Sequence, residues 1–272
     1  MRRGGLLWLA IYVLSQLGLY LTVKVSVSSL GLAAYLPVYL LGSSAPLIAL
    51  SRGRLSLDEG AVKLGLMQAL SAALWLVGMY YLQPASAAAL SYFMPFVAML
   101  IGYVALGEGV SAREGLGAAI AAVGVGVYTA YSVTGSLKVV GAAAALANTA
   151  AWASYSIYYR KLRGRDPVRL NASSLLLAGL VTLPALSMAR DVRLTSLATA
   201  SIIVVSLLVS ALGYVSWNRL VTAMSVPRAT LLSYAAPAAV AVAQYIMGSP
   251  LRTMQAVGLT VMIVGALVTF GG

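Results

Sequence analysis

The side chains of this chain that could do chemistry are few and of a restricted kind. The sequence contains no Cys and no His, which excludes thiol catalysis, imidazole acid–base chemistry and the usual zinc and haem ligands. No nucleophile and base are paired in the pattern that covalent catalysis requires. We therefore predict no catalytic residue, no metal site and no cofactor, and a protein that binds a solute without transforming it.

Two cations, Lys24 and Arg219, lie within or at the end of long apolar runs. Such cations usually face a cavity or a partner when the run crosses a membrane. Lys24 is either a snorkelling side chain at the outer interface or a cation at the outer end of a cavity. Arg219 follows Trp217 and Asn218; it either biases a cavity toward carboxylate or phosphate groups or lies at the outer head groups. We expect Gln16 and Asn218 to point inward, because lipid offers no hydrogen-bond partner.

The acidic residues are informative through their positions. All 6 fall between apolar runs or at their ends, at Asp58, Glu59, Glu108, Glu114, Asp166 and Asp191. A proton antiporter for cations generally needs a carboxylate inside the membrane that binds proton and substrate in turn. The sequence therefore favours neutral or anionic solutes over cations.

Aromatic residues recur in the apolar runs that carry these polar groups. The candidates for a solute-binding cavity are Trp75, Tyr80, Tyr92, Trp152, Tyr155, Tyr214, Trp217 and Tyr234. Their rings could stack on an amphipathic solute such as an amino acid. The alternative is an aromatic belt at the membrane surface, which needs no cavity.

The elements that position these residues must be membrane-spanning helices. Hydrophobic residues make up 61% of the chain, charged residues 9%, and the mean hydropathy is +0.93. We predict an all-α polytopic membrane protein with ten transmembrane helices. The expected spans are 6–27, 30–50, 61–82, 84–106, 112–133, 138–159, 168–188, 200–222, 227–247 and 252–270.

The second half of the chain repeats the first. S-Y-F-M-P at 91–95 recurs as S-Y-A-A-P at 233–237, and Trp75 recurs as Trp217. An odd number of spans in each half makes the repeats inverted, which is a construction of secondary transporters. The domains are then 1–135 and 136–272. Pro95 and Pro237 fall well inside their spans, so we expect each to kink its helix and line a pathway, with a packing kink as the alternative.

Basic residues predict the orientation in the membrane. The net charge is +12, and with the N-terminus inside we assign 12 of the 18 Lys and Arg residues to inside loops. The outside loops receive Lys138, Arg190, Arg193 and Arg228. This bias predicts a plasma-membrane protein with both termini cytoplasmic and with basic loops that meet lipid head groups. We expect no nucleic-acid binding, because the charge is spread over many short loops.

Small residues mark the fifth and tenth spans as packing elements. Ala118, Ala122 and Gly126 recur every four residues, and Gly258 and Gly265 lie at helical spacing in the tenth span. Such faces let helices approach closely within lipid. We interpret both spans as scaffold, with a dimer surface as an alternative, so a monomer and a homodimer both remain open.

The order of the motifs resembles the drug/metabolite transporter superfamily in its ten-helix form with two EamA-type repeats. The first repeat has Leu74-Trp75, Tyr80-Tyr81, Pro84-Ala85-Ser86, Pro95, Gly107-Glu108, Gly117 and Gly124. The second has Tyr214, Trp217, Pro227, Pro237, Gly248, Gly258 and Gly265, but Ser249-Pro250 replace the expected Glu.

The resemblance implies a secondary transporter or exporter of small organic metabolites that works by alternating access. Amino acids and similar amphipathic or anionic solutes are the expected cargo. Spans 1–4 and 6–9 would form the cavity, with spans 5 and 10 outside it. The alternatives are a passive channel-like facilitator and a membrane-integral enzyme.

Overall fold

A computed structural model describes residues 3–91, 93–107, 109–130, 133, 135–190, 192–193, 195–205, 210–224, 226–248 and 252–270. Tyr92, Glu108, Asp191, Ser249 and Pro250 lie outside the described residues. Within these ranges every named element is a helix, as the apolar runs predict. The elements are α1 Arg3–Leu50, α2 Glu59–Tyr81, α3 Pro84–Ser91, α4 Met94–Leu106, α5 Ala112–Ala130, α6 Ser136–Lys161, α7 Pro167–Thr182, η1 Leu183–Met188, α8 Ser196–Ile203, α9 Ala211–Ala223, α10 Val226–Leu232, α11 Ala235–Ile246 and α12 Thr253–Phe270.

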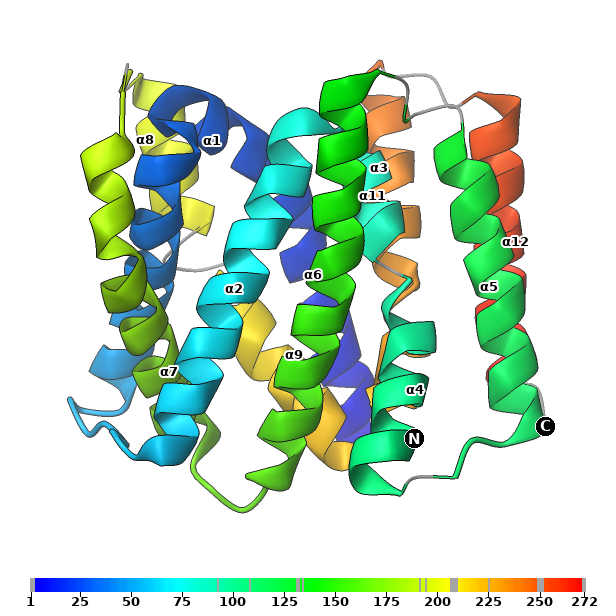
Figure 1. Ribbon diagram of the computed structural model, residues 1–272, viewed down its shortest axis with the longest axis horizontal. Helices are drawn as coiled ribbons and strands as arrows, with labels where there is room; N and C mark the ends of the chain where they lie inside the picture. Colours follow the sequence, from blue (N-terminus) through cyan, green and yellow to red (C-terminus); the bar gives the residue numbers. More distant parts are fainter. Residues whose placement is uncertain are drawn as a thin grey trace.

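Helix α1 holds the first two expected spans. Its residues are helical on both sides of Gly31, but Gly31 itself has φ 71 and ψ 164. A positive φ of this kind is open to Gly and strained for residues with a Cβ. The chain turns back at this end of the bundle, so the two parts of α1 run in opposite directions (Figure 1).

Among the described residues, five helical stretches are long and apolar enough to cross a bilayer. They are Gly5–Leu50, Glu59–Tyr81, Pro84–Val104, Pro167–Met188 and Arg228–Ile246, and a shorter apolar helix covers Thr253–Val268. The first stretch contains the turn at Gly31, and the third and fifth contain short interruptions. The structure is therefore that of a helical, multi-pass membrane protein.

The two prolines of the repeated motif do not bend continuous helices, contrary to our expectation. Helix α3 ends at Ser91 and α4 begins at Met94, so Pro95 lies in the first turn of α4. Likewise α10 ends at Leu232 and α11 begins at Ala235, which places Pro237 in the first turn of α11. A Pro in a first turn removes an N–H that has no intrahelical partner. Each proline thus restarts a helix after an interruption.

Helices α5 and α12 pack against each other at one side of the bundle (Figure 1). A Cβ on Gly124 of α5 would lie 2.5 Å from the backbone nitrogen of Met262, and a Cβ on Gly258 of α12 would lie 2.5 Å from that of Tyr128. Gly265 approaches Ala121 in the same way. This small-residue face is therefore an intramolecular helix–helix contact. These glycines are consequently not available as a surface for a second copy.

The N-terminus and the connections that follow α1, α4, α6 and α9 lie at one end of the bundle, which we call the basic end (Figure 1). Arg165 joins two of these connections by an ion pair to Asp58, with nitrogen and oxygen 2.6 Å apart. Arg228, at the start of α10, pairs with Glu114 at 2.8 Å. Our placement of Arg228 outside was therefore wrong, because it shares the end that carries the N-terminus.

Arg252 was also assigned to the wrong side. It precedes α12, which begins at the opposite end of the bundle and runs toward the C-terminus (Figure 1). Arg228 and Arg252 therefore exchange sides, and the excess of basic residues at the basic end is unchanged.

The ion pair of Asp58 predicts an acid-sensitive contribution to stability. The hydrogen bond from Arg165, followed by the bond from the Ala61 amide, lowers the pKa of the Asp58 carboxyl below its ordinary value. The ion pair therefore stabilises the folded protein fully above the pKa that Asp58 has in the unfolded chain, about 4. This stabilisation is lost as the pH falls through the lower pKa that Asp58 has in the folded protein. Asp58→Asn keeps a capping side chain for α2 but removes the charge.

We expect Asp58→Asn to unfold about 0.2–1 kcal/mol more easily than wild type at pH 7, the range for half-exposed ion pairs. The difference should shrink below about pH 4, where the wild-type carboxylate becomes protonated. Thermal unfolding in detergent across this pH range measures it. A difference that stays constant with pH would contradict the assignment.

Candidate functional site

A cavity of about 80 Å³ lies among α1, α2, α6, α9 and the two helix interruptions. Both halves of the chain contribute to its wall. The lining residues are Tyr12, Gln16, Leu19, Tyr20, Tyr39, Ser71, Ala72, Trp75, Ser91, Met94, Asn148, Trp152, Ser210, Gly213, Tyr214, Thr230 and Ser233. Four of the residues singled out in the sequence are among them, namely Gln16, Trp75, Trp152 and Tyr214.

Both interruptions of the repeated motif border the cavity. Ser91 and Met94 line it from the break between α3 and α4, and Thr230 and Ser233 line it near the break between α10 and α11. Backbone that leaves the helix inside a membrane must be shielded by protein or by a wet cavity. The position of these breaks at the cavity meets that requirement.

One wall of the cavity is built around Trp152. Its ring stacks on Tyr155, with centroids 4.9 Å apart and an interplanar angle of 18°. Tyr214 and Trp217 of α9 lie 5.7 and 6.0 Å away. Trp152 is half-buried, whereas Tyr155 and Trp217 are buried behind it. Trp152 thus presents a supported aromatic face to the cavity.

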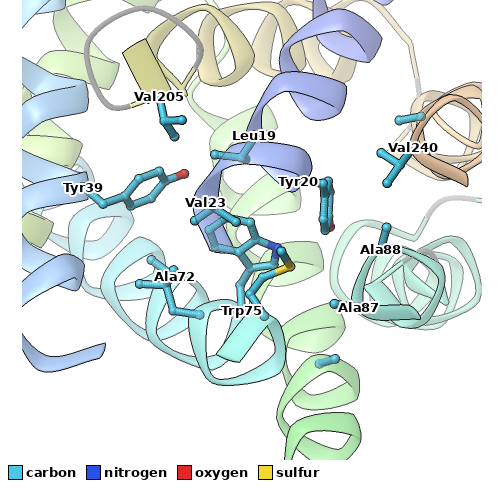
Figure 2. Packing of buried hydrophobic residues seen from close by; sticks show 14 of the residues in the cluster. Leu19, Tyr20, Val23, Tyr39, Ala72, Trp75, Ala87, Ala88, Val205 and Val240 are labelled. Atoms are coloured by element: carbon cyan, nitrogen blue, oxygen red, sulfur yellow. The ribbon is translucent and has the colours of Figure 1, made fainter. Parts of the chain in front are cut away.

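A second aromatic group lies around Trp75 of α2. Figure 2 shows its indole among Leu19, Val23 and Ala72, with Tyr20 and Tyr39 on either side. The centroid of each tyrosine ring lies 5.8 Å from the centroid of Trp75. The contacts of Tyr20 and Tyr39 join the two parts of α1 to α2. They fix the Trp75 ring at the cavity wall.

Hydrogen-bonding groups interrupt these apolar walls. Ser71 Oγ donates to Asn148 Oδ1 at 2.6 Å, which links α2 to α6 across the cavity lining. The Tyr39 hydroxyl donates to the Tyr214 hydroxyl at 3.5 Å. The side-chain polar atoms of the buried residues Gln68 and Ser210 have no hydrogen-bond partner. Ser210 lies at the cavity wall next to Tyr39, whereas Gln68 lies next to Tyr214 and does not line the cavity.

A buried polar network supports the Trp152 wall from behind. Asn218 Nδ2 donates to Asn171 Oδ1 at 2.7 Å and to the Tyr155 hydroxyl at 2.9 Å. Trp217 Nε1 donates to Ser156 Oγ at 2.9 Å. Tyr155, Trp217 and Asn218 therefore hold the wall in place and do not line the cavity.

Neither of the two expected cations lines the cavity. Lys24 Nζ donates to the carbonyl of Leu82 at 2.8 Å, where Leu82 caps the C-terminus of α2. A cation at that position is favoured by the helix dipole. Arg219 is exposed, and its guanidinium carbon lies 5.7 Å from the ring centroid of Trp8, near the N-terminus. Arg219 therefore lies toward the basic end rather than at outer head groups.

Tyr80, Pro95, Tyr234 and Pro237 do not line the cavity either. Tyr80 is 46% exposed and packs edge-to-face on Tyr81. Pro95 and Pro237 restart their helices, and Tyr234 is buried at the interruption before α11. Tyr92 lies outside the described residues.

Sequence reasoning missed several polar lining residues. Ser71 lies one helical turn before Trp75, and Asn148 lies one turn before Trp152, so each shares a helix face with a residue that we had selected. That spacing was a usable signal. No comparable sequence signal pointed to Tyr12 and Tyr39 as lining residues, because tyrosines are spread throughout the chain.

Comparison with known proteins agrees with this architecture. Residues 139–271 match the EamA-like transporter family. A relative from Acidianus ambivalens, named an uncharacterized transporter in sor 3'region, is 28% identical over 79% of this chain and 85% of its own length. The EamA-like match and this transporter-named relative together support an EamA-type transporter of the drug/metabolite transporter superfamily.

A second relative and one solved structure are also similar to this chain. The uncharacterized transporter YyaM of Bacillus subtilis is 21% identical over 73% of this chain and 68% of its own length. A crystal structure aligns with a TM-score of 0.78 and 19% identity, covering 98% of this chain and 96% of that one. The structural match covers both halves, so the whole chain shares its fold with that structure.

Proposed function

We propose that this EamA-type transporter moves small, uncharged or zwitterionic amphipathic solutes by alternating access. The observation that carries the proposal is the cavity itself, which both halves of the chain line with aromatic rings, amides and hydroxyls. None of its described lining residues carries a charge. A solute with an apolar or aromatic part and several hydrogen-bonding groups matches that wall.

This assignment narrows the range of solutes that the sequence suggested. Anionic solutes need a compensating cation when they leave water. Lys24 and Arg219 were the candidates for that role, but Lys24 caps α2 and Arg219 packs on Trp8. Neutral or zwitterionic metabolites such as amino acids therefore fit better than carboxylate or phosphate anions.

Ten crossings arranged as two inverted repeats would supply the motion. The matched interruptions, after Ser91 and after Leu232, support such a repeat, because each borders the cavity from its own half. Rocking of one half against the other would then expose the same lining residues to each side in turn.

Counterflow into proteoliposomes tests the proposal. Vesicles loaded with an unlabelled solute should accelerate entry of the same labelled solute, and a panel of amino acids and nucleotide sugars should show preference for the former. Measurement with and without a pH gradient separates proton-coupled from uncoupled movement. Flux without acceleration by internal solute would instead identify a passive facilitator.

Single cysteines test the proposed orientation, because the natural chain has no Cys. We expect an impermeant thiol reagent to label Ser136→Cys and Arg193→Cys from outside intact cells. Ser56→Cys and Gly164→Cys, at the basic end, should react only after permeabilisation. The reverse pattern would contradict cytoplasmic termini, and absence of label at the cell surface would contradict a plasma-membrane location.

A further inference from the structure

The two helix interruptions lie next to each other in the bundle. Helix α3 contacts α11 and α4 contacts α10, so the break between α3 and α4 meets the break between α10 and α11 (Figure 1). Each break carries the serine of the repeated S-Y-x-x-P motif, Ser91 in the first half and Ser233 in the second. Both serines line the central cavity. The two halves therefore contribute equivalent residues to its wall.

The hydroxyl hydrogens at the breaks are already used within the helices. Ser91 Oγ donates to the Ala87 carbonyl at 2.9 Å, and Ser233 Oγ donates to the Thr230 carbonyl at 2.6 Å. Thr230 Oγ1, which also lines the cavity, donates to the Val226 carbonyl. A hydroxyl has one hydrogen and two lone pairs, so these three groups can only accept hydrogen bonds from a solute.

The prolines of the motif add acceptor capacity at the same breaks. Pro95 and Pro237 lie four residues after the motif serines and have no N–H to donate to the serine carbonyls. The Ser233 carbonyl accepts instead from an amide of α11 at 2.8 Å, which leaves one of its lone pairs. The Tyr20 hydroxyl lies beside Ser91 and can occupy one lone pair of the Ser91 hydroxyl, which leaves the other.

The hydrogen-bond donors of the cavity wall come from other helices. Asn148 Oδ1 accepts from Ser71 Oγ, so the amide nitrogen of Asn148 remains for a solute. Ser210 is 2% exposed, and its hydroxyl has no hydrogen-bond partner among the described residues. The side-chain nitrogen of Gln16 lies 3.7 Å from the place where a Cβ on Gly213, one turn after Ser210, would be. Donors therefore gather on α1, α6 and α9, away from the acceptors at the breaks.

We propose that the two breaks form a subsite for the ammonium group of the solute, held by the hydroxyl oxygens of Ser91, Thr230 and Ser233. An ammonium group has three N–H donors and no acceptor, which matches three oxygens that can only accept. A carboxylate would meet the same oxygens acceptor to acceptor. It belongs instead beside the donors of α1, α6 and α9.

This subsite rests on the proposed function, because it applies only if the central cavity binds the solute. It adds an orientation and a requirement for an amine. None of the described lining residues is charged, so the carboxylate of a zwitterionic solute would supply the counter-charge for its own ammonium. A free monovalent cation such as Na⁺ has related chemistry, since it also takes oxygen ligands at unwound helices. The test below separates the two sources.

Equilibrium binding to the purified chain in a neutral detergent tests the subsite without requiring transport. The probes are leucine, isoamylamine, which keeps the ammonium but lacks the carboxylate, and isocaproate, which keeps the carboxylate but lacks the ammonium. Ser91→Ala and Ser233→Ala should each weaken leucine and isoamylamine about tenfold, as expected for loss of a hydrogen bond to a charged group. Isocaproate has no ammonium to lose, so both variants should bind it as wild type does.

Ser43→Ala is the matched control. Ser43 Oγ donates to the Tyr39 carbonyl at 2.6 Å in the same way, but Ser43 is fully buried and outside the cavity lining. This variant should bind all three probes as wild type does. Equal losses of leucine and isocaproate in the two motif variants would overturn the subsite, because the hydroxyls would then only shape the cavity.

Two further results separate this subsite from the proposed function. If Trp152→Ala weakened leucine while Ser91→Ala and Ser233→Ala did not, the cavity would remain the binding site and the ammonium subsite would be wrong. If wild type bound no leucine at millimolar concentration, both would be wrong. Binding of isocaproate that required Na⁺, and that both motif variants lost, would replace the ammonium with a free cation.

Discussion

Trp152→Ala should raise the KM for a transported solute about tenfold or more and change kcat less. The substitution removes the aromatic face that lines the cavity and that stacks on Tyr155 at 4.9 Å. Loss of a stacked aromatic contact and of the apolar area it buries amounts to about 1.4 kcal/mol or more, which corresponds to a tenfold change in affinity. Counterflow rates at several concentrations of the preferred solute measure the effect.

Two variants make this expectation selective. Trp152→Phe keeps an aromatic face and should recover most of the affinity, whereas a purely structural role for the indole would leave Phe and Ala equally impaired. Tyr80→Ala removes an aromatic residue of the same helix bundle that is 46% exposed and outside the cavity lining. Transport by Tyr80→Ala should match wild type. A normal KM in Trp152→Ala would remove the central cavity as the binding site.

Gly124→Ala and Gly258→Ala should each destabilise the folded protein by about 1–3 kcal/mol, the range for overpacking a close contact. A Cβ on Gly124 would lie 2.7 Å from the Gly258 carbonyl oxygen, and a Cβ on Gly258 would lie 2.7 Å from the Gly124 carbonyl oxygen. Backbone cannot rotate away as a flexible side chain can, so α5 and α12 must separate. Thermal unfolding in detergent measures the loss.

Gly126→Ala provides the control on the same helix. A Cβ at Gly126 meets no atom within 4 Å, and Ala has the higher helix propensity. This variant should be as stable as wild type or slightly more stable. If Gly126→Ala and Gly124→Ala lost equal stability, the effect would come from helix propensity or insertion and not from the contact between α5 and α12.

The double substitution distinguishes a shared contact from two separate ones. Gly124 and Gly258 face each other, so once one Ala has forced the helices apart, the second should cost less than it does alone. We expect the combined loss to be smaller than the sum of the single losses. Additive losses would indicate that the two glycines act at independent sites.

Several features of this protein could be predicted from the sequence, because they depend on local pattern. Long apolar runs with so few charges can satisfy their backbone in lipid only as helices, so the helical membrane class followed from composition alone. The repeat of S-Y-x-x-P marked two places where we expected kinks and where the helices are in fact interrupted. The small residues of the fifth and tenth spans identified helices that pack closely. Absence of acids from the apolar runs favoured neutral or anionic solutes, whereas the two cations that we placed at the cavity, Lys24 and Arg219, do not line it.

The partners of individual side chains depended on tertiary structure. A period of 3.6 residues gives the face of a helix on which a side chain lies, but it does not say which helix that face meets. Trp152 and Trp217 were both candidates for the cavity in the sequence. In the structure Trp152 lines the cavity, whereas Trp217 is buried behind Trp152. Likewise Lys24 could be recognised as unusual, but its bond to the Leu82 carbonyl needed the packing of α1 on α2.

Arg219 and Arg228 illustrate the same limit for charge. Both could be recognised in the sequence as cations beside apolar runs. The lengths of those runs did not determine on which side of the membrane each arginine lies. Only the assembled bundle brings Arg228 to Glu114 and Arg219 to Trp8, each pair joining segments that are far apart in the chain. Sequence alone determined that this is a helical membrane protein, because that property arises from local apolarity, and the order of its motifs gave the resemblance to transporters. The composition of its cavity was decided by long-range packing, which local pattern does not encode.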